Sequence, residues 1–176
     1  MAADMNDRGR IVASDVRPKR LALLQETIKT AESRCVSVVR VPQAGPLPFE
    51  ATFDAVLVDA PCSGLGTVRR DPDIRWRRQE QDLAALARDQ LALLMRAAEV
   101  VRVGGRLVYA TCSSEPEEND DVVANFIASR PGFRIVDLPT HAGAVIAPFI
   151  DAHGFFRTTP SAHGLEAFYA ALLIRS

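Results

Sequence analysis

A chain of 176 residues is long enough to form one domain with a hydrophobic core, without disulfides or a structural metal. Hydrophobic residues make up 48% of the sequence and charged residues 24%, which excludes a disordered or low-complexity protein. The formal net charge of −1 excludes a uniformly basic nucleic-acid-binding domain, so any contact with nucleic acid has to come from a local patch.

The N-terminal part of the chain predicts two strands with a helix between them. Residues 10–14 form a mostly apolar run that ends at Asp15, which indicates a buried strand. Pro18 then opens a helix at a position where its missing N–H costs nothing, and Leu21, Leu24 and Ile28 recur at helical spacing. Residues 35–41 predict the second strand.

The middle of the chain predicts a strand, a long helix and another strand. Residues 53–59 are apolar on both faces at their centre, as expected for a central parallel strand that helices cover. After an arginine-rich loop, residues 79–101 carry leucines at helical spacing, and we expect Gly104-Gly105 to end this helix. Residues 106–111 predict the next strand.

The C-terminal part predicts one more helix and the last strands. The helix over residues 117–129 begins among acidic residues, which the helix dipole favours at that end. Residues 133–138 and 167–174 predict late strands, and residues 154–157 a further short one. Strands that alternate with helices predict an α/β fold of Rossmann type with a mostly parallel sheet.

Several common features of sequence are missing. The polar start resembles no signal peptide, and no apolar run approaches the roughly 20 residues that span a bilayer, so we expect a cytoplasmic protein without membrane contact. Cys35, Cys62 and Cys112 lie far apart, which predicts free thiols in a reducing compartment. No metal site is predicted, because metal-ligand spacing is missing from the three histidines, His141, His153 and His163. No feature indicates an oligomeric state.

Side chains that could bind a ligand or take part in catalysis lie at the ends of the predicted strands. In α/β sheets, ligands bind beyond the carboxyl ends of the strands. Here those ends carry Asp15, Asp59 and Cys112. We therefore expect two carboxylates and a thiol to converge on one crevice.

Each of these residues also has a purely structural interpretation. A cysteine after a strand is more often a small buried apolar residue than a nucleophile. Asp15 could simply flank a helix, and Asp59 could form a turn in an ordinary loop with Pro61 and Gly64. Taken one at a time, these residues do not establish a site.

Together, two segments resemble the signature motifs of the Sun/NOP2 family of RNA cytosine-5 methyltransferases, in particular its bacterial ribosomal RNA branch. The segments are Asp59-Ala-Pro-Cys-Ser-Gly-Leu-Gly66 and Tyr109-Ala-Thr-Cys-Ser-Ser-Glu115. The resemblance extends to four further stretches and covers nearly the whole chain: residues 9–15, 69–76, 115–119 and 163–169. It implies a Rossmann-like class I methyltransferase fold, S-adenosylmethionine as cofactor and ribosomal RNA as substrate.

The resemblance also implies roles for individual residues. Carbon 5 of cytosine is a poor nucleophile, so an enzyme first adds a thiolate to carbon 6. The family's nucleophile corresponds to Cys112, and Cys62 corresponds to the cysteine that resolves the adduct. Asp59 would stabilise charge at ring nitrogen 3, helped by partial burial. Asp15 would accept hydrogen bonds from the cofactor ribose, with further cofactor contacts from Asp59 and Pro61.

An arginine cluster follows the first motif. It contains Arg69, Arg70, Arg75, Arg77 and Arg78, with Trp76 among them. Such charges usually form a solvated surface, but the position next to the motif favours contact with RNA, above all by Arg69, Arg70 and Arg75. Trp76 could stack on a base or anchor the loop, and the sequence favours neither.

The chain departs from the family pattern near its start. Relatives carry a strand and an Ala-Pro-Gly-Gly-Lys loop shortly before the position of Gly9, and an acid that contacts adenine where this chain has Val41-Pro42. A crossover connection alone takes about a dozen residues, so the loop does not fit before Gly9. We expect residues 1–176 to form a single but partial catalytic domain, truncated at its N-terminus, lacking its first strand and glycine-rich loop, with unpaired sheet edges.

Two functions of different class follow. The first is an RNA cytosine-5 methyltransferase that acts through a Cys112 adduct. The second is a non-catalytic remnant that binds RNA or a protein partner through the same crevice. A thiol-based redox protein is disfavoured, because Cys62 and Cys112 lie in separate motifs and no Cys-x-x-Cys is present.

Overall fold

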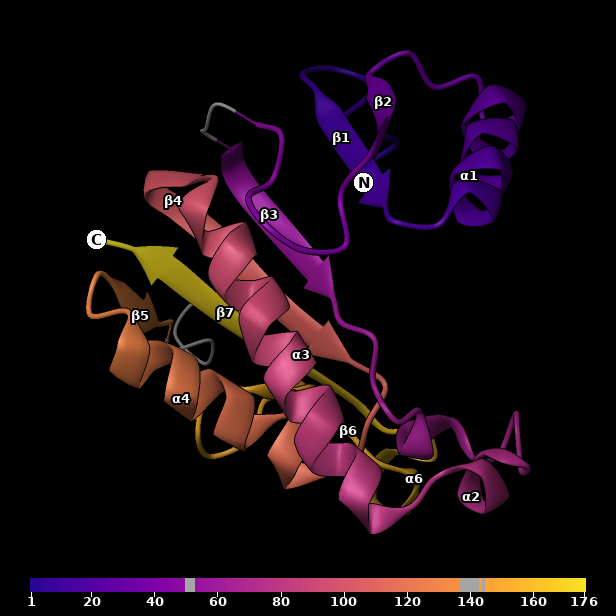
Figure 1. Ribbon diagram of the computed structural model, residues 1–176, viewed down its shortest axis with the longest axis vertical. Helices are drawn as coiled ribbons and strands as arrows, with labels where there is room; N and C mark the ends of the chain where they lie inside the picture. The colour runs from indigo at the N-terminus through magenta and orange to yellow at the C-terminus, as the bar shows by residue number, and fades with distance from the viewer. Residues whose placement is uncertain (50–52, 137–142, 144) are drawn as a thin grey trace. The chain divides into compact units, whose positions relative to one another are not determined.

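The computed structural model describes residues 1–49, 53–136, 143 and 145–176. The chain forms two compact units, Met1–Pro48 and Phe49–Ser176, which are described separately (Figure 1). The second unit contains both cysteine motifs of the sequence.

The first unit is built on a strand–helix–strand segment, as the sequence predicts. Strand β1 (Ile11–Asp15) pairs in parallel with β2 (Val36–Arg40), and helix α1 (Pro18–Thr30) connects them. Pro18 occupies the first turn of α1, where no intrahelical N–H is needed. The parallel pairing places the ends of β1 and β2, Asp15 and Arg40, side by side.

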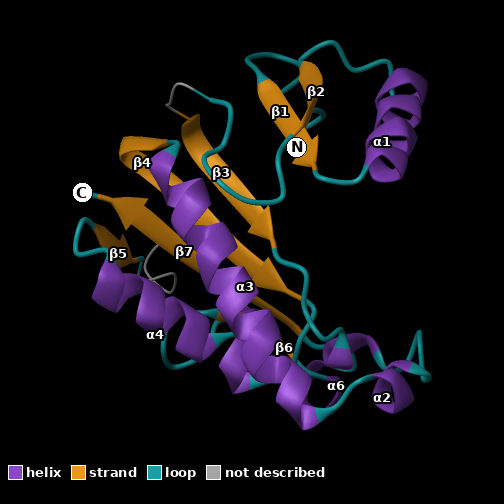
Figure 2. Cartoon of the chain, in the orientation of Figure 1, coloured by secondary structure: helices purple, strands orange, loops and turns teal. Residues whose placement is uncertain are grey.

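The second unit contains a five-stranded sheet in which one strand runs against the others. Its strands are β3 (Phe53–Asp59), β4 (Val101–Thr111), β5 (Phe133–Ile135), β6 (Phe156–Thr158) and β7 (Phe168–Arg175), with the order β3-β4-β7-β5 and β6 also paired with β7 (Figure 2). β3 and β4 are parallel, whereas β7 is antiparallel to β4, β5 and β6. Among the described strands of this sheet, β7 alone runs in the opposite direction, which confirms a mostly parallel α/β sheet.

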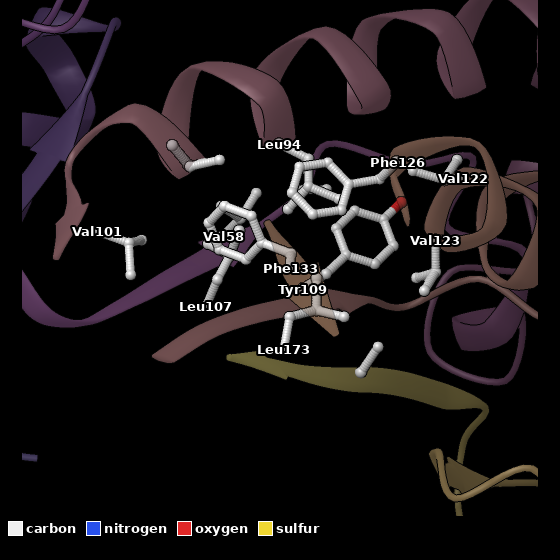
Figure 3. Close-up of a cluster of buried hydrophobic side chains, with 14 of the residues drawn as sticks. Val58, Leu94, Val101, Leu107, Tyr109, Val122, Val123, Phe126, Phe133 and Leu173 are labelled. Atoms are coloured by element: carbon white, nitrogen blue, oxygen red, sulfur yellow. The ribbon is translucent and has the colours of Figure 1, made fainter. Parts of the chain in front are cut away.

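Two helices, α3 (Glu80–Glu99) and α4 (Asp120–Ser129), pack together across one face of this sheet (Figure 1). The core lies between them and the strands (Figure 3). α3 contributes Leu94, α4 contributes Phe126, and the strands contribute Leu107, Tyr109 and Leu173, all of which are fully buried. Aromatic and branched side chains thus fill the space between the helices and the sheet, which contributes most of the stability of such a unit.

Strand β3 is not central in the second unit, contrary to the prediction. It forms the edge of the five-stranded sheet, and Leu57 at its middle is 51% exposed. Its apolar composition is compatible with several positions in a sheet, because hydrophobicity does not specify neighbours. Among the described strands, β1 pairs only with β2 and β3 only with β4, so each keeps an unpaired edge, as expected.

The predicted end of the long helix is also wrong. α3 ends at Glu99 and β4 begins at Val101, so both glycines lie within the strand. Gly104 has a φ of 72°, and a Cβ on Gly105 would lie 2.8 Å from the carbonyl oxygen of Arg102. The glycines therefore permit an irregularity in the strand, next to the register shift between β3 and β4.

The short elements escaped the sequence prediction. Within the described residues they are the one-turn helices α2 (Ile74–Arg77) and α6 (Pro160–His163), and the 3₁₀ turns Leu65–Thr67, Pro116–Glu118 and Ala147–Phe149. The predicted strand over 133–138 is shorter, since β5 ends at Ile135. Residues 137 and 138, and His141, lie outside the described residues. Within the described ranges, no helix is both long and apolar enough to cross a membrane.

Candidate active site

The two cysteine motifs meet at one edge of the sheet in the second unit. β3 and β4 are parallel neighbours, with Asp59 opposite Ala110, so the loops that follow them leave the sheet together. The Sγ atoms of Cys62 and Cys112 lie 3.1 Å apart. Both thiols are free and half-buried. The predicted convergence of the two motifs is confirmed in its geometry.

A glycine allows the first loop to approach the second so closely. The N–H of Gly66 donates to the carbonyl oxygen of Cys112 at 3.0 Å, and the N–H of Ala167 donates to that of Gly66 at 3.0 Å. A Cβ at residue 66 would lie 2.2 Å from the Ala167 oxygen and 2.7 Å from the Cys112 oxygen. Any larger residue would push the loops apart, so Gly66 is needed for the contact itself.

Asp59 lies at the end of β3, in the same edge region as the thiols. Its side chain is exposed, so the predicted partial burial is wrong. The charge of Asp59 nevertheless acts on Cys112, where it raises the pKa of the thiol.

The two thiols have opposite ionisation preferences. Hydrogen bonding from Cys62 lowers the pKa of Cys112 to about 7, against burial and the charge of Asp59, which raise it. The same hydrogen bond, together with burial, raises the pKa of Cys62 far above that of an ordinary thiol. The pair therefore favours a Cys112 thiolate that accepts a hydrogen bond from a protonated Cys62. A thiolate at neutral pH is the reactive form of cysteine.

This asymmetry predicts the pH dependence of alkylation at Cys112. The thiolate forms as the pH rises through the pKa, so the rate with iodoacetamide should rise with a midpoint near pH 7. In Cys62→Ala the stabilising donor is lost, and the midpoint should move up towards the ordinary thiol value of about 8.5. At pH 7 the rate should fall by about tenfold or more. Peptide mass spectrometry measures it, and an unchanged midpoint would contradict the assignment.

A buried polar cluster beneath the thiols was not predicted from the sequence. It is centred on Glu118, which is 0% exposed, and includes Ser63, Gln90, Ser113 and Asn119, all buried. The acidic residues within 115–121 predicted only the start of a helix. The sequence does not show which of them are exposed and which are buried. Glu117 is exposed, whereas Glu118 accepts hydrogen bonds from both cysteine loops.

The arginine cluster is largely engaged in contacts within the protein. Arg69 and Arg78 donate to the carbonyl oxygens of Gly164 and Ser63, Arg70 pairs with Glu166, and Arg77 pairs with Asp71. Arg75 lies over the ring of Trp76, 5.7 Å from its centroid, and Trp76 is 80% exposed. The exposure excludes Trp76 as an anchor of the loop and presents a stacked cation and ring to solvent.

The candidate cofactor residues lie in both units. In the first unit, Asp15 ends β1, and its Oδ1 accepts the N–H of Arg17 at 2.7 Å. An open hollow of about 1110 Å³ lies at the ends of β1 and β2, lined by residues 16–20 and 40–43. In the second unit, the carbonyl oxygen of Pro61 accepts from Gln90 at 3.0 Å. That Asp15 joins the other residues in one site stays a prediction.

The part of the chain that the structure describes contains no group of three or more histidine, cysteine, aspartate or glutamate side chains that could hold a metal ion.

Comparison with known proteins relates the whole chain to one family. The family model for 16S rRNA methyltransferase RsmB/F matches residues 1–174. Ribosomal RNA small subunit methyltransferase B of Pseudomonas syringae is 37% identical over 166 residues, and the probable enzyme of that name in Bacillus subtilis is 32% identical over 171 residues. Each match covers 94% of this chain and 37% of the relative, so the chain spans less than half their length.

The solved structures give the same result for the fold. NSun6 from Pyrococcus horikoshii, crystallised with SFG, matches with a TM-score of 0.85 and 29% identity, over 99% of this chain and 43% of that one. A methyltransferase homologue from the same organism matches with a TM-score of 0.73 and 27% identity, over 98% and 55%. The predicted Rossmann-like methyltransferase fold is thereby confirmed.

Proposed function

Because the chain belongs to the RsmB/F family of 16S rRNA methyltransferases, we propose that it methylates carbon 5 of cytosine in 16S rRNA through a covalent bond to Cys112. The observation that carries this proposal is the 3.1 Å contact between the Cys112 and Cys62 sulfurs, which favours a thiolate on Cys112. The sequence motifs supply the two thiols, and the pairing of β3 with β4 brings them into contact.

The first chemical step is addition of the Cys112 thiolate to carbon 6 of cytosine. The new sulfur–carbon bond uses the thiolate electron pair, and electron density moves into the ring towards nitrogen 3 and carbon 5. Asp59, at the end of β3, would stabilise this ring nitrogen through a hydrogen bond. Carbon 5 becomes enamine-like. Bound S-adenosylmethionine would supply the methyl group from its sulfonium and leave as S-adenosylhomocysteine.

The second step releases the product. A base takes the proton from carbon 5, the electron pair returns to the ring, and the bond between carbon 6 and the Cys112 sulfur breaks. The leaving group is again the Cys112 thiolate, and a protonated Cys62 at 3.1 Å stabilises it by donating a hydrogen bond. The same contact that activates Cys112 for addition therefore assists its departure.

The residues of the first unit fit the nucleoside part of the cofactor. Asp15 offers a partly exposed carboxylate for the ribose hydroxyls, and Val41 and Pro42 add apolar surface to the adjoining hollow. A volume of about 1110 Å³ is ample for a nucleoside. SFG, an S-adenosylmethionine analogue, in the NSun6 structure supports the same cofactor. We also propose that residues 1–176 form a single catalytic domain, and that Pro61 and Asp59 contact the cofactor.

The RNA contacts are proposed for the arginine-rich segment. Arg75 and Trp76 offer an exposed cation and an exposed ring that could stack on a base. Arg69 and Arg70 have exposed side chains that keep donors for phosphate beside their internal partners. A 16S rRNA substrate would place the protein in the bacterial cytoplasm.

Covalent trapping tests the proposal. The chain is incubated with S-adenosylmethionine and a 16S rRNA fragment in which 5-fluorocytidine replaces cytidine. Fluorine on carbon 5 cannot leave as a proton does, so the second step is blocked and the adduct should survive denaturation. The complex should require the cofactor and disappear in Cys112→Ala, while Cys35→Ala serves as the matched control and should retain it.

The outcomes separate the two functions predicted from the sequence. A denaturation-stable complex that depends on Cys112 and on the cofactor supports the methyltransferase. RNA that binds the folded chain without any such complex supports a non-catalytic RNA-binding domain instead, and the proposed reaction would then be wrong for this chain.

A further inference from the structure

Glu118 is an acidic side chain in the interior of the second unit. It ends the 3₁₀ turn Pro116–Glu118 and is 0% exposed, although the preceding Glu117 is exposed. Burying a carboxylate is costly unless hydrogen bonds compensate it. Hydrogen-bond donors around the Glu118 carboxylate therefore have to compensate its burial.

Four donors surround this carboxylate. Its Oε1 accepts the N–H of Ser63 at 2.8 Å and the side-chain amide of Gln90 at 2.8 Å. Its Oε2 accepts the hydroxyl of Ser63 at 2.5 Å and the hydroxyl of Ser113 at 2.6 Å. Both oxygens are thus fully used by donors of the protein, which compensates the burial.

These donors come from the two segments that carry the thiols. Ser63 directly follows Cys62, and Ser113 directly follows Cys112. The two serine hydroxyls lie 3.2 Å apart, both in contact with Oε2. One carboxylate group therefore joins the residues next to both sulfurs, across 55 residues of sequence in the case of Ser63.

Further hydrogen bonds within the cluster hold Glu118 and the residues around it. Tyr109 donates its hydroxyl to the carbonyl oxygen of Glu118 at 2.6 Å, and the side-chain amide of Gln90 also donates to the Pro61 carbonyl at 3.0 Å. Asn119 donates to the carbonyl oxygen of Ser113 at 3.0 Å. Residues of β4, α3 and the turn are thus joined by hydrogen bonds around the carboxylate.

We propose that Glu118 is a positioning residue that holds the Cys62 and Cys112 sulfurs in contact. It does so by tying the loop after β3 to the loop after β4, and it does not touch the substrate. The inference rests on the proposed function for its purpose, since the thiol contact matters because Cys112 is the nucleophile. Its geometry stands independently of that reaction.

The test replaces Glu118 by glutamine and compares Glu117→Gln, the same change on the exposed neighbour. A glutamine offers one acceptor oxygen to four donors, so at least two hydrogen bonds are lost without a change of size. The measured quantity is the pH midpoint of Cys112 alkylation by iodoacetamide. We expect Glu118→Gln to raise this midpoint from about 7 by roughly one pH unit or more, and Glu117→Gln to leave it unchanged.

The direction of the shift distinguishes positioning from simple electrostatics. Removal of a nearby negative charge would by itself lower the pKa of Cys112, because the charge of Glu118 raises it. Loss of the Cys62 contact raises it. A midpoint that falls or stays near 7 in a folded Glu118→Gln chain would overturn the proposal.

A second readout measures the thiol contact directly. Diamide oxidises two thiols to a disulfide while its azo bond is reduced to a hydrazine. Closure between Cys62 and Cys112 should be at least about tenfold slower in Glu118→Gln than in Glu117→Gln, because the effective concentration of one thiol at the other falls. Equal rates would contradict the proposal. If Glu118→Gln does not fold, Ser113→Ala removes one tether alone and should shift both readouts in the same direction.

Neither readout uses RNA or cofactor, so this proposal and the proposed reaction can fail separately. Altered thiol chemistry with no trapped RNA would leave Glu118 as a positioning residue and refute the methyl transfer. Trapped RNA with unaltered thiol chemistry in Glu118→Gln would support the methyl transfer and refute the positioning role of Glu118.

Discussion

A Cys62→Ala chain is expected to hold unmodified RNA in a covalent complex that the unsubstituted chain releases. In the proposed reaction, Cys62 stabilises the Cys112 sulfur as it leaves carbon 6, and the sulfurs are 3.1 Å apart. Without this donor, release should slow by about 100-fold or more, the usual size of a lost general-acid contribution. Denaturing gels with labelled 16S rRNA fragments and S-adenosylmethionine would show the retained complex.

The pH of this experiment matters, because Cys62 also lowers the pKa of Cys112. Its loss also raises the pKa of Cys112, so addition should be slow at pH 7 and is better measured near about pH 9, where an ordinary thiol is ionised. Cys62→Ala combined with Cys112→Ala should form no complex, and Cys35→Ala should behave as the unsubstituted chain. Ordinary release by Cys62→Ala would remove Cys62 from the second step.

Phe126→Ala is expected to cause a large loss of stability. Phe126 is 0% exposed, and its ring packs 5.3 Å from that of Phe133 in an edge-to-face arrangement. Truncation of a fully buried phenylalanine costs about 3–5 kcal/mol of unfolding free energy, because the transfer energy is lost and a cavity remains. This is a large part of the total of about 5–15 kcal/mol that holds a domain folded.

Urea unfolding would measure the effect through the transition midpoint. Phe168→Ala is the matched control, because Phe168 lies in β7 and is 41% exposed. It should lose much less, about 1 kcal/mol or below, since little new cavity forms. Similar losses in both variants would mean that the packing of α4 on the sheet does not dominate the stability of the second unit.

The elements with strong local signals were predicted correctly from the sequence. α1 begins at Pro18, and β3 spans the predicted residues 53–59. Proline position and runs of apolar residues determine such elements through the chain within a few residues, so one sequence suffices to find them. Cys62 and Cys112 were singled out instead by the resemblance of two short motifs to a known family, and each motif follows a predicted strand.

Partners distant in sequence could not be found by that route. The position of β3 at an edge, the pairing of Arg70 with Glu166 and the burial of Glu118 all depend on which segments pack together. The sequence shows the arginines as a cluster, but only the fold shows that Arg78 donates to Ser63 while Arg75 lies over Trp76. The exposure of Trp76 likewise follows from the fold, whereas its stacking on a base stays a prediction.

By itself, the sequence determined the α/β order of elements and placed a thiol after each of two strands. Only the tertiary structure decided that the Cys62 and Cys112 sulfurs touch, that Cys112 is the more acidic of the two, and that Glu118 joins their loops. The physical reason is the distance along the chain over which the deciding interactions act. A helix or strand is selected by neighbours a few residues away, whereas burial, hydrogen bonding and pKa depend on atoms that folding brings together across 50 residues or more.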